Sequence, residues 1–183
     1  MILPIYTYGN AVLRKQTEPI SADYPELKTL ISNMYETMYK AEGVGLAAPQ
    51  VGLAIRLLVI DLVAFKEENP ELGSFKKVMI NPTIIESSEE EEAAEEGCLS
   101  IPGIHESVTR PTNIKISYQD EDFNPYTEEF DGFKARVIQH EYDHLEGHVF
   151  TDRVSPIRRQ LLKSRLTNIV KGKTSCDYKV KKA

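Results

Sequence analysis

The amino-acid sequence predicts an α+β fold, in which antiparallel or mixed β-strands pack around one central helix. Short segments rich in β-branched residues follow one another between residues 55 and 130, without helical patterns between them. A helical pattern then covers residues 131–147. Two further amphipathic stretches predict one helix near the N-terminus and another near the C-terminus.

The composition is that of one globular domain. The chain has 183 residues, of which 41% are hydrophobic, so it can bury a single core. The net charge of −6 argues against a DNA-binding protein or a general nucleic-acid binder. The longest apolar run, Ile55–Val63, contains Arg56 and Asp61, and no segment is expected to enter a membrane.

The N-terminal part is predicted to be an irregular arm followed by a helix. Residues 3–20 lack periodicity and contain several turn signals. Asp23 is predicted to cap a helix that has Pro25 in its first turn and ends at Gly43. The apolar stripe of this helix consists of Leu27, Leu30, Ile31, Met34 and Met38.

The segment Gly43–Gln50 is predicted to be a loop of small residues. Its bare backbone would let a peptide substrate bind against it as an additional strand. The alternative is a tight turn between a helix and a strand. Gln50 brings a side-chain amide, which is a neutral donor suited to an oxyanion.

The middle of the chain is predicted to be a series of strands. They are expected at residues 55–61, 78–85, 104–109, 112–118 and 126–130. Seven acidic residues between Glu86 and Glu96 predict a solvent-exposed loop. The last strand leads into the central helix.

The central helix contains the pattern His-Glu-x-x-His. His140 and His144 lie one turn apart on one helix face, where two imidazoles can bind one metal ion. Glu141 can reach a water on that ion without binding the ion. The alternative is a helix with two surface histidines. Phe133 and Val137 share the stripe of the histidines and serve either core packing or a substrate pocket.

Such a site needs a third protein ligand. Phe150 occupies the position of a third histidine in the longer zinc-peptidase pattern, and residues 160–170 contain no acidic residue. Cys98 is the remaining candidate, although a lone cysteine is more commonly a small buried hydrophobic residue. This cysteine and the two histidines would leave one tetrahedral position for water.

Three segments together resemble the signature motifs of the peptide deformylases. They are Gly43-Val44-Gly45-Leu46-Ala47-Ala48-Pro49-Gln50, Glu96-Gly97-Cys98-Leu99-Ser100 and Gln139-His140-Glu141-Tyr142-Asp143-His144. The resemblance covers roughly residues 3–158. It implies removal of the N-formyl group from formyl-methionine at the start of new polypeptides, with release of formate. Metal-bound water or hydroxide would be the nucleophile and Glu141 the general base and acid.

The resemblance also implies roles for individual residues. The metal ligands would be Cys98, His140 and His144. The catalytic residues would be Glu141, Gln50 and the backbone N–H of Leu99. The substrate-binding residues would be Val44, Gly45, Gly97, Phe133 and Val137. The expected cofactor is one Fe²⁺ per chain, with Zn²⁺, Ni²⁺ or Co²⁺ able to substitute, although the ligand types alone favour Zn²⁺. Asp143, on another helix face, is expected to pair with Arg110.

The C-terminal part is predicted to be a basic helix and tail. Ser155 and Pro156 are predicted to start the helix. From Pro156 to Ala183 there are nine Lys or Arg residues and one acidic residue. An exposed helix with a disordered basic tail is one interpretation. The other is docking on an RNA-rich surface, which the resemblance favours because the C-terminal segment is associated with the ribosome in some members of the family.

These observations predict a deformylase-like catalytic domain over residues 1–170, including the C-terminal helix, and a basic, flexible tail over residues 171–183. The two cysteines form no disulfide framework, and a thiolate ligand needs a reducing compartment, so a cytoplasmic location is expected. The N-terminus Met-Ile-Leu-Pro has no targeting pattern. The rival predictions are a metallopeptidase that cuts internal peptide bonds and an RNA-binding module with a structural metal site.

Overall fold

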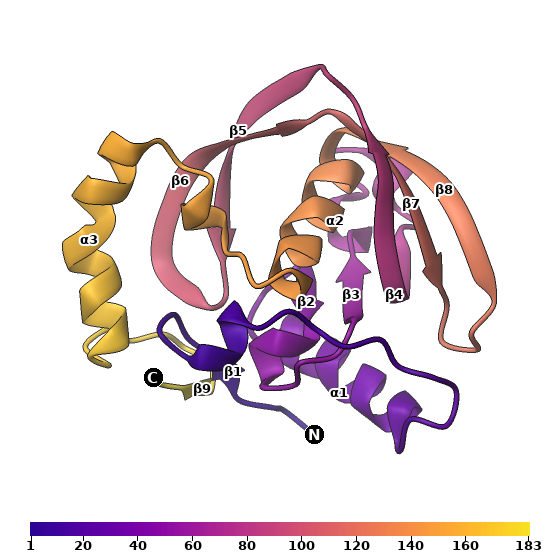
Figure 1. Ribbon diagram of the computed structural model, residues 1–183, viewed down its shortest axis with the longest axis horizontal. Helices are drawn as coiled ribbons and strands as arrows, with labels where there is room; N and C mark the ends of the chain where they lie inside the picture. The colour runs from indigo at the N-terminus through magenta and orange to yellow at the C-terminus, as the bar shows by residue number, and fades with distance from the viewer.

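The computed structural model describes residues 1–183 and contains three α-helices and three β-sheets (Figure 1). One sheet is antiparallel, with the strand order β2 (Gly45–Ala47), β3 (Leu57–Asp61), β4 (Lys76–Ser87), β7 (Asn113–Gln119) and β8 (Pro125–Asp131). A separate antiparallel hairpin consists of β5 (Glu91–Cys98) and β6 (Ile101–Pro111). The third sheet pairs β1 (Ile5–Tyr6) with β9 (Val180–Lys181) in parallel. The mixed sheets and three helices agree with the predicted α+β class.

Helix α2 (Gly132–Leu145) lies between the five-stranded sheet and the β5–β6 hairpin (Figure 1). Asp131 precedes it with an extended backbone, and Gly147 follows it with a φ of +76°. A side chain at position 147 would meet the Arg14 carbonyl oxygen, so glycine permits both the left-handed turn and the close approach of that backbone. The helix that carries the His-Glu-x-x-His pattern therefore ends at a glycine-dependent turn, while Asp131 makes no side-chain capping hydrogen bond at its start.

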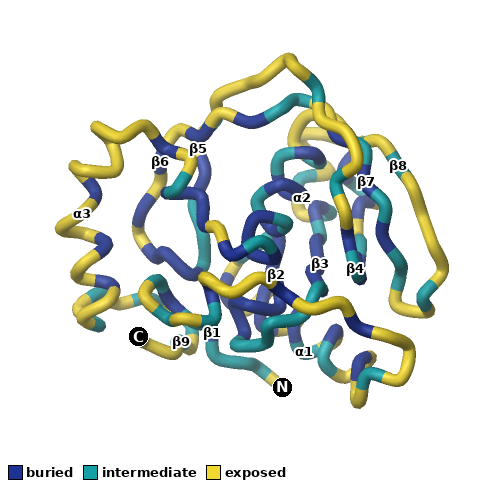
Figure 2. Tube along the Cα trace, in the orientation of Figure 1, coloured by how far each residue is buried: buried dark blue, intermediate teal, exposed yellow.

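Strand β3 is the centre of the core because it is buried on both faces. Side chains alternate between the faces of a strand, so Leu58 and Ile60 pack with Ile138 of α2. Leu57 and Val59 point the other way and pack with the buried stripe of α1 (Leu27–Lys40). Each such buried side chain contributes about 1.5–3 kcal/mol. Figure 2 shows most of β3 in dark blue, and α2 with buried positions among intermediate ones after an exposed first turn.

Helix α3 (Pro156–Val170) packs against β6 at the edge of the molecule. Ser155 caps it by accepting a hydrogen bond from the Arg158 N–H, so the predicted start is confirmed. Leu162 and Leu166 contact Val108, while the outer face of the helix is exposed (Figure 2). None of the helices has the length and apolar character needed to cross a bilayer.

Short 3-10 helices connect the larger elements, at Ala11–Arg14, Ala48–Val51, Val63–Phe65, Pro70–Leu72 and Phe150–Asp152. Beyond α3, the chain turns at Gly172 and returns to the main body, where β9 pairs with β1. The basic segment 171–183 therefore ends beside the N-terminal strand (Figure 1).

Three predictions about local structure are wrong. The segment Gly43–Gln50 is not a loop, because Gly45–Ala47 pairs with β3 as strand β2 and Ala48–Val51 forms a 3-10 helix. Helix α1 begins at Leu27 and not at Asp23, because Glu26 precedes it with a left-handed φ of 54°. The acidic segment is not a loop, since β4 extends to Ser87 and β5 starts at Glu91. Apart from the buried Glu96, its carboxylates face water while the backbone of β5 pairs with β6, so no apolar alternation marks the strand.

Candidate active site

A cleft with a volume of about 720 Å³ lies beside α2. Strand β2 borders it as an edge strand of the five-stranded sheet, and β5, which pairs only with β6, borders it from the hairpin. All predicted site residues line this cleft except His144, which is fully buried behind it. The size is typical of a site for a small ligand or a short peptide.

Cys98, His140 and His144 come together at the floor of the cleft. Their candidate ligand atoms all lie within 4.8 Å of one another. The Cys98 Sγ, at the end of β5, is 3.3 Å from the His144 Nε2 on α2. A thiolate and two imidazoles are donors that suit Zn²⁺ and Fe²⁺. The residues present therefore fit one divalent transition-metal ion.

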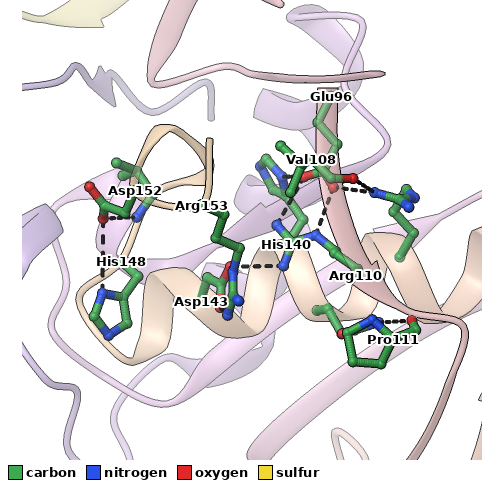
Figure 3. A network of polar contacts seen from close by, with 12 residues as sticks. Glu96, Val108, Arg110, Pro111, His140, Asp143, His148, Asp152 and Arg153 are labelled. Atoms are coloured by element: carbon green, nitrogen blue, oxygen red, sulfur yellow. Dashed lines mark hydrogen bonds and ion pairs between the residues drawn. The ribbon is translucent and has the colours of Figure 1, made fainter. Parts of the chain in front are cut away.

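A buried ionic network contacts the Nδ1 atom of His140 and orients its ring (Figure 3). Glu96 Oε1 lies 2.8 Å from the His140 Nδ1, and Glu96 also accepts hydrogen bonds from Arg110 and Arg136. Burial opposes ionisation of Glu96, but the hydrogen bonds from His140 and Arg110 lower its pKa to about 2. An ionised Glu96 is suited to accept a hydrogen bond from the Nδ1–H of His140, and in that tautomer the Nε2 would be the atom that binds a metal ion.

Asp143, three residues after His140 on α2, belongs to the same network (Figure 3). Its Oδ2 accepts hydrogen bonds from the Arg110 Nη1 at 2.9 Å and from the Arg153 Nε at 2.6 Å. The predicted pairing of Asp143 with Arg110 is therefore confirmed, and Asp143 is not part of the Cys/His group. Arg110, with a side chain only 1% exposed, bridges Glu96 and Asp143.

Glu141 lies beside the Cys/His group and is 4% exposed. Its Oε2 has no hydrogen-bond partner, and burial raises its pKa to about 7. A side chain on Gly45 would overlap the Glu141 carboxylate, so the bare β2 backbone makes room for it. A carboxyl group in this environment can both accept and release a proton near neutral pH.

Two hydrogen-bond donors face the cleft from opposite elements. Gln50 Oε1 accepts the Ala47 N–H at 2.8 Å, which directs Nε2 toward the Cys98 Sγ at 3.5 Å. In the β5–β6 turn, the Leu99 N–H donates to no backbone carbonyl. The Gln50 Nε2 also donates to the Ser100 Oγ at 3.3 Å, so an oxygen atom that gains negative charge would take over one of these two hydrogen bonds. The Leu99 N–H has no backbone partner to give up.

The apolar side of the cleft is formed by Val44, Phe133 and Val137. Phe133 is 39% exposed and packs edge-to-face on Phe65, with ring centroids 5.3 Å apart. Gly97 lies on β5 opposite this wall, where a side chain would collide with the His105 ring.

Sequence reasoning missed several residues of the cleft. Arg136 supports Glu96, and its position one turn before His140 on the same helix was a usable signal. Cys176 and Tyr178 also line the cleft. Nothing in the local sequence indicates this, because the contacts depend on the return of the chain after α3.

Comparisons with known proteins agree with the geometry. A family model described as polypeptide deformylase matches residues 2–160. Peptide deformylase of Flavobacterium psychrophilum is 53% identical over 188 residues, which cover 99% of this chain and 97% of that protein. The relative from Christiangramia forsetii, also named peptide deformylase, is 51% identical over 99% of this chain and 96% of that protein.

Solved structures give the same result. A peptide deformylase from Legionella pneumophila is 36% identical with a TM-score of 0.82, over 94% of this chain and 98% of that chain. The peptide deformylase from Thermotoga maritima is 43% identical with a TM-score of 0.77, over 85% of this chain and 99% of that chain. The resemblance seen in the three motifs is confirmed. The chain belongs to the polypeptide deformylase family, metal-dependent hydrolases that remove the N-formyl group from nascent polypeptides.

Proposed function

We propose that deformylation takes place in the cleft beside α2, at one divalent ion held by Cys98, His140 and His144. The observation that carries this proposal is the convergence of three soft or borderline donors within 4.8 Å, next to a buried carboxyl group without a partner. When bound, the ion supplies Lewis acidity, which acidifies water and polarises a carbonyl group. We propose Fe²⁺ as the native ion, with Zn²⁺, Ni²⁺ or Co²⁺ as possible replacements, since all accept thiolate and imidazole ligands.

Glu141 is the proton carrier of the proposed mechanism. Its carboxylate accepts a proton from the attacking water as the new carbon–oxygen bond forms at the formyl carbon. It then delivers this proton to the amide nitrogen as the carbon–nitrogen bond breaks, which yields formate and a free amine. The burial that raises its pKa to about 7 supports both transfers near neutral pH.

Gln50 and Leu99 stabilise the charge that develops on the formyl oxygen. Two observations support these roles: the Gln50 Nε2 lies 3.5 Å from the Cys98 Sγ, and the N–H of Leu99, a residue that lines the cleft, makes no backbone hydrogen bond. Loss of one such donor typically costs about 2.7–4 kcal/mol of transition-state stabilisation.

The cleft holds an extended peptide between two strand edges. The unpaired edge of β2 offers the Gly45 backbone, and β5 offers the Gly97 backbone on the opposite side. Val44, Phe133 and Val137 accept the methionine side chain on the apolar wall. A formyl carbon carries only hydrogen, so it can reach the floor where larger acyl groups would collide with the walls.

The enzyme is proposed to work in the cytoplasm, where Cys98 stays reduced as a thiolate ligand requires.

We also propose that α3 and the following segment dock on ribosomal RNA. The exposed Lys163 and Lys171 have no carboxylate partner on the chain. Replacing both with Glu should weaken co-sedimentation with ribosomes at low salt. The same change at Lys15 and Lys66, two exposed lysines elsewhere, is the control. Equal sedimentation of both variants would remove the docking proposal.

Formate release from formyl-Met-Ala-Ser by anaerobically prepared protein tests the proposed function. Glu141→Gln should keep the ion and lose nearly all turnover, because the amide cannot carry the proton. Glu129→Gln, an exposed change on β8, should retain full activity. Turnover of Glu141→Gln at the wild-type rate would disprove the proton-carrier role.

A further inference from the structure

The segment after α3 returns to the active site. Ser175, Cys176, Asp177 and Tyr178 line the cleft together with the residues of α2 and β5. The segment is held at its far end by β9, whose Lys181 carbonyl oxygen accepts hydrogen bonds from the Thr7 N–H and from Asn10. Both ends of the segment are thus anchored, one by helix α3 and the other by the parallel pairing with β1.

Tyr178 makes a specific contact from this segment. Its hydroxyl donates a hydrogen bond of 2.7 Å to the Leu99 carbonyl oxygen, across 79 positions of sequence. Tyr178 lies outside residues 2–160, which the family model matches, so a role for it does not follow from family membership alone.

The contact acts on the tight turn that joins β5 to β6. This turn consists of Leu99 and Ser100, between the paired Cys98 and Ile101. The Ser100 carbonyl oxygen accepts the Tyr8 N–H at 2.8 Å, which fixes one side of the turn. The Leu99 carbonyl is fixed by Tyr178 alone, since no other hydrogen bond reaches it. The Leu99 carbonyl lies in the Leu99–Ser100 peptide plane, and this plane is joined through the Leu99 Cα to the neighbouring plane that contains the Leu99 N–H. Holding the carbonyl therefore restricts the ψ angle of Leu99 and limits how far the two-residue turn, with its N–H, can move.

We propose that Tyr178 is a positioning residue for deformylation, because its hydroxyl holds the Leu99 turn so that the Leu99 N–H points at the formyl oxygen. The inference rests on the proposed function, in which this N–H is one of two oxyanion donors. A positioning role predicts an effect on the chemical step and not on peptide binding, because a donor that meets developing charge acts mainly in the transition state.

The test is Tyr178→Phe in the full chain, which removes one hydroxyl and keeps the ring. With formyl-Met-Ala-Ser, kcat should fall about three- to tenfold, the size expected for one neutral hydrogen bond acting indirectly, while KM stays within about twofold. The same fall in kcat should appear with the shorter formyl-Met-Ala, because the effect acts at the formyl oxygen. Metal content and Tm should equal those of the wild type.

Backbone NMR of the same variant supplies a readout apart from turnover. The order parameter of the Leu99 amide should fall, while that of Val59 in the buried strand β3 should not change. Tyr126→Phe is the matched control, since it removes an exposed hydroxyl bonded to Asp120 at 3.2 Å, away from the cleft. It should leave all these quantities unchanged.

Three outcomes would overturn the inference. Unchanged kcat would show that the contact has no part in the reaction. A rise in KM that grows with peptide length would make Tyr178 a wall of the peptide site instead of a positioning residue. Loss of metal or a lower Tm together with the lower kcat would make its role structural. If the wild type itself released no formate, the proposed function would fail, and the NMR result would still report on the turn.

Discussion

The Nδ1 atom of His140 lies 2.8 Å from Oε1 of Glu96, and the same carboxylate is held by Arg110 and Arg136. The strand residue two positions before Cys98 thus orients a helix residue of the same Cys/His group. Strand β5 supplies the candidate ligand Cys98 and, through Glu96, orients the second candidate ligand His140 on α2. The position of β5 therefore affects the position of the His140 ring.

Replacement of Glu96 by Gln should weaken metal binding about 10- to 100-fold, because the amide no longer fixes the His140 tautomer as a carboxylate does. Competition with a chromophoric chelator measures this affinity. Glu91→Gln, an exposed change on the same strand, should bind the ion as the wild type does. Equal affinities for the Glu96 and Glu91 variants would contradict the orienting role.

Replacement of Arg110 by Met should lower the free energy of unfolding by about 3–5 kcal/mol, because Glu96 and Asp143 would remain buried with fewer cations. Urea denaturation measures the change. Lys28→Met breaks the ion pair with Asp122, whose side chains are 79% and 63% exposed, and should have no measurable effect. Similar decreases in the free energy of unfolding for the two variants would show that the burial of the Arg110 network does not contribute to stability.

Replacement of Gly45 by Ala should lower kcat/KM at least about tenfold, since the new methyl group overlaps the Glu141 carboxylate. Formate release measures the activity, and urea denaturation shows whether the fold survives. Gly73→Ala, in an outlying turn with a φ of −62°, is the control and should remain fully active. Full activity of Gly45→Ala would argue against the placement of Glu141 beside β2.

Replacement of Asp152 by Asn should destabilise the protein by about 1 kcal/mol near neutral pH, because Asp152 pairs with a half-exposed Arg14. Burial opposes ionisation of Asp152, but the Arg14 hydrogen bond lowers its pKa below the ordinary 3.8. A lowered pKa gives stability that is present above pH 3.8 and is lost as pH falls through the folded-state value. The difference between wild type and variant should therefore shrink below pH 3.8 in urea titrations. A difference that grows at low pH would contradict the pairing.

Much of the site could be predicted because its chemistry is local in sequence. Helical spacing alone places His140 and His144 on one face, and elimination of other ligands leaves Cys98 as the candidate. The helix face of Asp143 predicts a buried carboxylate that needs a cation, but it does not determine which cation, and the structure identifies Arg110 and Arg153.

Other features depend on tertiary structure and were missed. The acidic strand β5 carries charges on a hairpin that projects into water, so its sequence has the composition of a loop. Tyr178 reaches Leu99 because β9 pairs with β1 at the opposite end of the chain, and a two-residue strand leaves no periodic signal.

The most direct test of the account is the X-ray absorption fine structure of the bound metal ion in anaerobically purified protein. The account predicts one sulfur ligand at about 2.3 Å together with two imidazole nitrogens, and loss of the sulfur in Cys98→Ala. A spectrum without sulfur, or one that Cys98→Ala leaves unchanged, would contradict the proposed ligand set and the mechanism built on it.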